Sequence, residues 1–212
     1  MTQSPWPPLA QPLQISQQTV HVVHVPLETD DGQLDRLKSV LSPDESTRAD
    51  RYKVPQPRRH FIACRAVLRQ LLGECLNCSP NEVQFDYGSH GKPALRQSDC
   101  SSPRIEFSVS HSSNQALIAL TAGRLIGVDI EQQDPSVRIM KLAQRFFSAR
   151  EATELMRLPE ADQQEGFFRG WTCKEAYLKA TGFGLSFPLN KFSVSLDPGQ
   201  PAQLLEVVDQ PT

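Results

Sequence analysis

Two acidic side chains, Asp129 and Glu131, stand two positions apart in the apolar segment Leu125 to Glu131. Because side chains alternate along a β-strand, a strand here places both carboxylates on one face, ~7 Å apart, and the apolar residues on the other. Two like charges so placed destabilise each other unless a cation or water lies between them. Carboxylates suit Mg²⁺, which binds a few of them together with water and phosphate oxygens. The alternative is a solvated outer strand face.

A second group of polar side chains lies in residues 162–181, which are predicted to form a long helix that ends before Gly182. It consists of Trp171, Lys174, Glu175 and Lys179. Glu175 and Lys179 are one turn apart on the same helix face. Taken alone, such a pair is usually a surface feature that contributes a few tenths of a kcal/mol.

Two other segments carry groups that could bind phosphate oxygens. One is the loop formed by Gly91, Lys92 and Pro93, and the other is the end of a predicted strand at Ser110 and His111. Lysine and histidine donate hydrogen bonds to phosphate, and glycine lets the backbone approach closely. The alternative for a single histidine at a strand end is a hydrogen-bonded structural role.

Basic side chains also concentrate between residues 48 and 69, where Asp50 is the only acid. They are Arg48, Arg51, Lys53, Arg58, Arg59, Arg65 and Arg69. Such a series is either a solvated helix face or a site for a terminal phosphate or an acidic partner.

The elements that would position these groups follow from periodicity, caps and turns. The N-terminal part predicts strands over 19–25, 83–87, 105–110, 115–121 and 125–131, the last three as an antiparallel meander, and helices over 34–41, 42–52 and 58–72. In the C-terminal part we expect three helices: one over 137–147, a second that begins at the cap Ser148, and a third over 162–181. A hairpin that pairs 191–196 with 204–208 follows them. The prediction is an α+β fold with an arm over 1–18, one half over 19–123 and a second over 124–212.

Composition excludes several classes of protein. With 212 residues, 39% of them hydrophobic, the chain can bury a substantial core. A net charge of −2 gives no general attraction to nucleic acid or to an anionic membrane. No apolar run of ~18 residues and no signal peptide is visible, so we expect a cytoplasmic protein with reduced cysteines. Cys75 and Cys78 lack the further ligands that a zinc site needs.

The motifs described above occur in an order and at spacings that resemble the surfactin-type 4′-phosphopantetheinyl transferases. The similarity runs from about Leu41 to Phe192. The matching segments are G-K-P at 91–93, F-S-V-S-H-S at 107–112, G-V-D-I-E at 127–131, F-F-S-A-R-E at 146–151 and W-T-C-K-E-A-Y-L-K-A-T-G at 171–182.

This resemblance implies a fold and a reaction. The fold is a pseudo-twofold monomer of two similar α+β halves, with antiparallel sheets, packed helices and coenzyme A between the halves. The reaction moves the 4′-phosphopantetheine arm of coenzyme A onto a serine hydroxyl of an apo acyl or peptidyl carrier protein. It depends on Mg²⁺ and releases adenosine 3′,5′-bisphosphate. Family members usually continue past residue 208 with a further strand, so the second half is expected to be shortened.

The resemblance also assigns roles to residues. Asp129, Glu131 and Glu175 would bind Mg²⁺, and Lys179 would contact the pyrophosphate. The other expected contacts of coenzyme A are Arg59, Arg65, Lys92, Pro93, Ser110, His111 and Lys174. The expected catalytic set is Glu175, Lys179, Glu151 and His111. For Glu151 an alternative stays open, because Ser148 and Glu151 also have the spacing of a capping box.

Two other functions compete with this interpretation. A phosphatase or nuclease would use Asp129 and Glu131 equally well, but it would not account for Lys92, His111 and the Trp171 segment together. A non-catalytic coenzyme A binding protein is the other alternative. The presence of all three acids and both lysines argues against it.

Overall fold

A computed structural model describes residues 13–88, 91–96, 104–184 and 187–208 of the chain. The chain separates into two compact units, Met1–Leu125 and Ile126–Thr212, which are called unit 1 and unit 2 below. The boundary between the two halves that the sequence suggests at residue 123 stays a prediction. Most of the predicted arm, residues 1–12, lies outside the described part.

Unit 1 is built on a three-stranded antiparallel sheet with the order β1 (His21–Pro26), β5 (Gln115–Ala122), β4 (Ile105–Ser112). The central strand β5 is almost continuously apolar because it is paired on both edges and buried along most of its length. A two-stranded antiparallel pair, β2 (Phe85–Tyr87) and β3 (Pro93–Leu95), completes the strands described in this unit.

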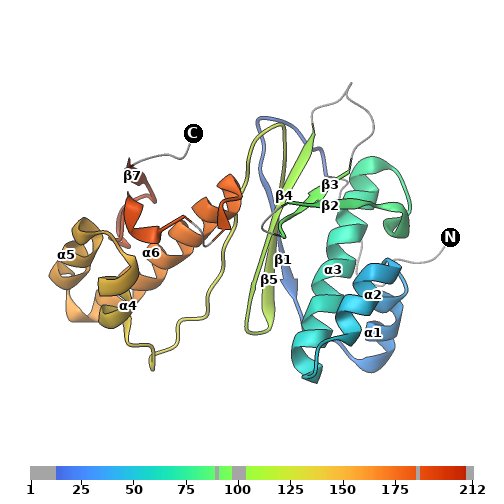
Figure 1. The fold of residues 1–212 in the computed structure, drawn as a ribbon, viewed down its shortest axis with the longest axis horizontal. Coiled ribbons are helices and arrows are strands. Elements are labelled where there is room, and N and C mark those ends of the chain that lie inside the picture. The colour runs from blue at the N-terminus through green and yellow to red at the C-terminus, as the bar shows by residue number, and fades with distance from the viewer. Residues whose placement is uncertain (1–12, 89–90, 97–103, 185–186, 209–212) are drawn as a thin grey trace. The chain divides into compact units, whose positions relative to one another are not determined.

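The helices of unit 1 pack around α3 (Pro55–Leu76), which lies beside the three-stranded sheet (Figure 1). Two short helices, α1 (Asp31–Lys38) and α2 (Pro43–Asp50), lie next to it, and a 3₁₀ turn, η1 (Pro80–Glu82), follows it. Buried apolar residues of α3 form one core with those of the sheet. The chain leaves α3 through Asn77, whose left-handed backbone (φ 52°) ends the helix.

Unit 2 is centred on α6 (Glu160–Thr181). Two shorter helices, α4 (Ile139–Phe146) and α5 (Ala149–Arg157), pack against it, and a 3₁₀ turn, η3 (Leu189–Lys191), leads into a hairpin of β6 (Phe192–Val194) and β7 (Leu204–Val207). The core is largely aromatic, with Phe147 stacked on Phe167 at 5.2 Å between ring centroids. Gly182, with φ 76°, ends α6.

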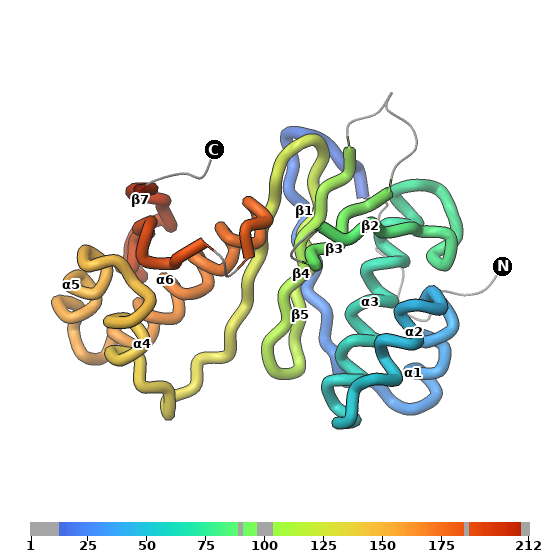
Figure 2. Tube along the Cα trace, viewed as in Figure 1, coloured from blue at the N-terminus to red at the C-terminus, as the bar shows by residue number. Residues whose placement is uncertain are grey.

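The predicted fold class is confirmed, since helices and antiparallel strands pack together in both units. One predicted element is wrong. The segment 125–131 is assigned neither helix nor strand, and Figure 2 shows it as part of an extended connection between β5 and α4. The alternation of apolar and polar residues predicted a strand. The segment instead packs against a helix, as described below. None of the described helices is long and apolar enough to cross a membrane.

Candidate functional site

The extended segment after β5 lies directly against α6 at Gly127. A Cβ atom on Gly127 would stand 1.8 Å from the carbonyl oxygen of Ala176 and 2.6 Å from the backbone nitrogen of Ala180. Only glycine permits such an approach, because any side chain would overlap the helix backbone. Ala176 and Ala180, four positions apart, give the helix a smooth face at this contact. The contact therefore places the residues after Gly127 next to the C-terminal part of α6.

Asp129 and Lys179 meet at this contact. The Lys179 ammonium donates a hydrogen bond to Oδ1 of Asp129 at 2.7 Å. The Asp129 side chain is only 4% exposed, whereas that of Lys179 is 30% exposed. A carboxylate taken out of water needs such a partner, and the lysine supplies it from one turn beyond Glu175.

Glu175 completes the cluster. Burial raises the pKa of the Glu175 carboxyl, the negative charges of Asp129 and Glu131 raise it further, and the positive charge of Lys179 acts in the opposite direction. The charges of Asp129, Glu131 and Lys179 therefore all act on the Glu175 carboxyl. We call Asp129, Glu131, Glu175 and Lys179 the acid cluster. Across the described residues, no three His, Cys, Asp or Glu side chains form a group that could hold a metal ion by themselves.

Glu151 and Lys174 lie elsewhere in unit 2, in its core, and both side chains are fully buried. Glu151 accepts hydrogen bonds from the backbone nitrogens of Ser148 and Val194, each at 2.8 Å, and forms an ion pair with Lys174 at 2.8 Å. The Lys174 ammonium also donates to the carbonyl oxygens of Leu189 and Phe192. These contacts hold the start of α5, η3 and β6 against α6.

This geometry corrects two sequence-based assignments. Glu151 forms the capping box with Ser148 that their spacing predicted. Both of its carboxylate oxygens accept hydrogen bonds inside the protein. Glu151 is therefore not placed to take a proton from a substrate. Lys174 cannot reach a ligand because its side chain is 0% exposed. The two lysines of the Trp171 motif differ because they are five positions apart on α6, so at 3.6 residues per turn their side chains point ~140° apart around the helix.

The predicted arginines of unit 1 are also engaged within the protein. Arg59 pairs with Asp31 at 2.6 Å and donates to the carbonyl oxygen of Thr29. Arg65 is 10% exposed, with its guanidinium 5.0 Å from the centre of the Phe85 ring. Arg65 therefore packs from α3 against β2, and it also lies 3.6 Å from the carboxylate of Glu45 on α2.

The remaining predicted contacts lie on the strands of unit 1. Lys92 is half-buried just before β3, which Pro93 begins, and burial lowers the pKa of its ammonium. Ser110 is buried in β4, and His111 is exposed beside it. His111 lines a pocket of about 420 Å³ together with a second histidine, His60, on α3.

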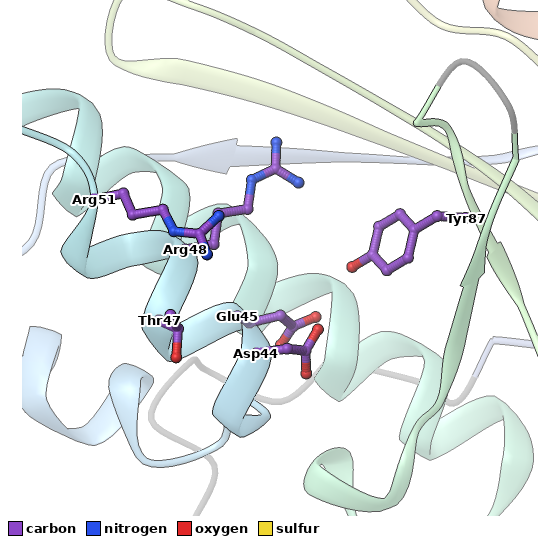
Figure 3. A pocket seen from close by; sticks show the side chains of 6 residues that line it. All are labelled: Asp44, Glu45, Thr47, Arg48, Arg51 and Tyr87. Atoms are coloured by element: carbon purple, nitrogen blue, oxygen red, sulfur yellow. The ribbon is translucent and has the colours of Figure 1, made fainter.

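Sequence reasoning did not single out a further pocket, shown in Figure 3. It has a volume of about 600 Å³ and is lined by Asp44, Glu45, Thr47, Arg48, Arg51 and Tyr87. The Tyr87 hydroxyl points across it toward α2. Within the described part of the chain neither Arg48 nor Arg51 forms an ion pair, in contrast to Arg69, which pairs with buried Glu45 at 2.5 Å. The pocket therefore carries two guanidinium groups without an ion pair among the described residues. One of them, Arg48, lies 5.1 Å from the centre of the Phe61 ring, and the carboxylate of Asp44 lines the same pocket.

Replacing Gly127 with alanine should destabilise unit 2, because the added Cβ forces the segment away from α6. We expect a loss of ~1–3 kcal/mol, the usual cost of overpacking a close contact. Urea unfolding measures it. Gly32→Ala in α1 is the matched control: its nearest neighbour is 3.4 Å away, and alanine is a better helix former. Equal stability of Gly127→Ala and wild type would contradict the close contact.

Removing either partner of the buried Glu151–Lys174 ion pair should lower the stability of the protein. Glu151→Gln and Lys174→Met should each lower the free energy of unfolding by ~3–5 kcal/mol, because each leaves a partner uncompensated in the core. The double variant should lose less than the sum of the two. Arg58→Ala, which breaks an exposed pair with Asp50 on the surface, should change stability little. Strict additivity would show that the pair is not coupled.

Comparison with known proteins identifies the family of this chain. The model of the 4′-phosphopantetheinyl transferase superfamily matches residues 125–210, and a model described as 4′-phosphopantetheinyl transferase, N-terminal, matches residues 28–122. The 4′-phosphopantetheinyl transferase HetI of a Nostoc species is 43% identical over 96% of this chain and 85% of its own length. The 4′-phosphopantetheinyl transferase Sfp of Bacillus subtilis is 28% identical over 76% of this chain and 69% of its own.

Among solved structures, the holo-[acyl-carrier-protein] synthase of Neisseria meningitidis matches 49% of this chain and 95% of its own, with a TM-score of 0.32 and 15% identity. The two family models together span both units, and the similarity to HetI extends over nearly the whole chain. This chain therefore belongs to the 4′-phosphopantetheinyl transferase superfamily.

Proposed function

We propose that this enzyme transfers the 4′-phosphopantetheine arm of coenzyme A to a serine hydroxyl of an apo acyl or peptidyl carrier protein. The reaction depends on Mg²⁺ and releases adenosine 3′,5′-bisphosphate. Family membership supports the reaction class. The observation that carries the proposal is the acid cluster, in which Asp129 is held by Lys179 at 2.7 Å and Glu175 is influenced by both.

The acid cluster contains the kind of donor that a divalent cation binds, although its carboxylates, all of them in the described part of the chain, do not form a metal-binding group in this structure. Asp129 is almost fully buried, and repulsion from Asp129 and Glu131 contributes to the raised pKa of Glu175. Such mutual repulsion is relieved when a cation binds, and carboxylate oxygens are the donors that Mg²⁺ prefers. We propose Asp129, Glu131 and Glu175 as the residues that hold it. Bound there, Mg²⁺ supplies positive charge to the oxygens of the pyrophosphate.

The residues of the cluster then have distinct tasks. The serine oxygen attacks the phosphorus that carries the pantetheine arm, and the bond from that phosphorus to the oxygen of the adenosine 5′-phosphate breaks. The Lys179 ammonium donates hydrogen bonds to the pyrophosphate, where charge develops as the bond breaks. The serine proton goes to Glu175, directly or through a water.

Unit 1 provides the groups that we propose for the nucleotide end of coenzyme A. The candidates are Lys92, Pro93, Ser110 and His111, retained from the resemblance. In place of Arg59 and Arg65, which are engaged within the protein, we propose Arg48 and Arg51 in the pocket of Figure 3 as the ligands of the terminal phosphate. Guanidinium groups bind phosphate through paired hydrogen bonds.

Mass spectrometry of apo acyl carrier protein incubated with coenzyme A and Mg²⁺ tests the proposal. We expect the carrier to gain the mass of one phosphopantetheine, with adenosine 3′,5′-bisphosphate released in equal amount. EDTA, Asp129→Asn or Glu175→Gln should reduce the rate at least ~100-fold, since each removes charge needed in the transition state. Glu160→Gln, an exposed acid at the other end of α6, is the control and should retain full activity.

Two outcomes of this assay would count against the proposal. A carrier that gains no mass although the protein binds coenzyme A would indicate a non-catalytic binding protein. Full activity of Asp129→Asn and Glu175→Gln would place the metal elsewhere.

The arginine pocket gives a separate kinetic prediction. Arg48→Gln and Arg51→Gln should raise the KM for coenzyme A by ~10-fold with little change in kcat, because a contact far from the reacting phosphorus contributes equally to substrate and transition-state binding. The KM for 3′-dephospho-coenzyme A should change much less. Arg36→Gln, on the exposed surface of α1, is the control. An equal rise for both substrates would show that the pocket does not bind the terminal phosphate.

A further inference from the structure

Two opposite charges are buried in unit 1 at a place that the proposed reaction does not use. They are Glu45 of α2 and Arg69 of α3, and each side chain is 2% exposed. Nε of Arg69 donates a hydrogen bond to Oε2 of Glu45 at 2.5 Å. A buried ion pair adds little to stability compared with apolar residues of similar volume, because both charges must leave water. The pair therefore matters chiefly for what its other hydrogen bonds hold in place.

One wall of the pocket in Figure 3 is α2 with the residue that follows it, and Glu45 fixes this wall. Oε2 of Glu45 also accepts a hydrogen bond from the backbone nitrogen of Ser42 at 3.1 Å, within the capping box of α2. The same carboxylate oxygen thus ties the start of α2 to Arg69 of α3. Arg48 and Arg51, which supply the positive charge of the pocket, follow Glu45 along this wall.

The opposite wall is β2, which carries Tyr87, and Arg69 holds the chain that leads into it. Nη1 of Arg69 donates hydrogen bonds to the carbonyl oxygens of Pro80 and Val83, each at 2.9 Å. The Arg69 guanidinium also lies 5.4 Å from the centre of the ring of Phe85, the first residue of β2. A single side chain of α3 therefore connects the two walls.

Arginine is suited to this connection. Its planar guanidinium has five N–H donors in fixed directions, so Nε can face a carboxylate while Nη1 faces two carbonyl oxygens. Arg69 also neutralises the Glu45 carboxylate, which lines the pocket and would otherwise repel an anion. Paired hydrogen bonds from two guanidinium groups to one phosphate need closely defined distances, so the separation of the walls affects phosphate binding.

We propose that Glu45 and Arg69 are a positioning pair for the pocket of Figure 3. They fix α2 against the chain that enters β2, and so set the affinity for the terminal phosphate of coenzyme A without donating a hydrogen bond to it. This inference rests on the proposed function, in which Arg48 and Arg51 bind that phosphate. The rest of coenzyme A binds equally well with or without the pair.

Calorimetric titration of the full chain with coenzyme A and with 3′-dephospho-coenzyme A tests this role, because only the first ligand carries the terminal phosphate. Glu45→Met combined with Arg69→Met replaces the pair with apolar side chains, so urea unfolding should show little loss of stability. The Kd for coenzyme A should rise ~10-fold, the usual contribution of one hydrogen bond to a charged group. The Kd for 3′-dephospho-coenzyme A should not change.

Arg69→Lys is a second variant, which keeps both buried charges and needs no apolar repacking. An ammonium has a single nitrogen, so it cannot face Glu45 and the two carbonyl oxygens from the positions that Nε and Nη1 occupy. It should show the same selective loss of coenzyme A affinity. Glu151→Met combined with Lys174→Met removes the matched buried pair of unit 2 and should leave the ratio of the two Kd values unchanged.

Combination with Arg48→Gln and Arg51→Gln separates this role from the pocket itself. Once those guanidinium groups are gone, Glu45→Met with Arg69→Met should cause no further loss of coenzyme A affinity, since the pair acts through them. An unchanged ratio of Kd values in a folded Glu45→Met, Arg69→Met variant or in Arg69→Lys would overturn the positioning role, and so would an equal rise for both ligands.

Failure of the pocket assignment would look different. If Arg48→Gln and Arg51→Gln themselves leave the ratio of the two Kd values unchanged, the terminal phosphate binds elsewhere. The pocket assignment is then overturned together with the positioning role, whereas the transfer reaction itself is tested separately by the mass gain of the carrier protein.

Discussion

The close approach of Gly127 to the backbone of α6 is the contact on which the site depends. A chain segment with any larger residue would stand farther from the helix, and Asp129 would then lose Lys179. The helix is fixed from the core as well. Gly170 allows Leu196 and Phe147 to pack close against it, and the buried pair of Lys174 with Glu151 holds it to the start of α5. The position of α6 is therefore set by short contacts that do not include the substrate.

The electrostatics of the acid cluster follow from that packing. When ionised, three carboxylates and one ammonium leave an excess of negative charge at a partly buried place. Proteins rarely hold like charges together unless the arrangement serves binding or catalysis, since the repulsion lowers stability. Burial is the main cause of the raised pKa of Glu175, and the repulsion from Asp129 and Glu131 adds to it. In the proposed function a divalent cation would offset this repulsion.

The sequence predicted most elements because caps and periodicity act locally. Ser42 and Glu45 gave the start of α2, Ser148 and Glu151 the start of α5, and Gly182 the end of α6. The segment 125–131 was misassigned because alternation alone does not say whether a strand or a helix lies alongside.

The sequence could not show which polar residues are buried. The spacing of Glu151 fitted both a cap and a catalyst, and only its contacts with Val194 and Lys174 decide between them. Arg65 and Arg48 looked alike in a basic series, and both lie over phenylalanine rings, yet Arg65 lies beside buried Glu45 and Arg48 lines a pocket. The alanines facing Gly127 were the signal available in the sequence, because two small residues four positions apart mark a helix face that accepts a close neighbour.

Diffraction from crystals soaked in Mn²⁺, measured at the manganese absorption edge, tests the central claim most directly. We expect an anomalous peak from a manganese ion bound by the carboxylates of Asp129 and Glu175. The contact at Gly127 brings these two acids together from distant parts of the chain. A peak located away from both carboxylates would contradict the account. It would leave the acid cluster as a structural ion pair and the metal site of this enzyme elsewhere.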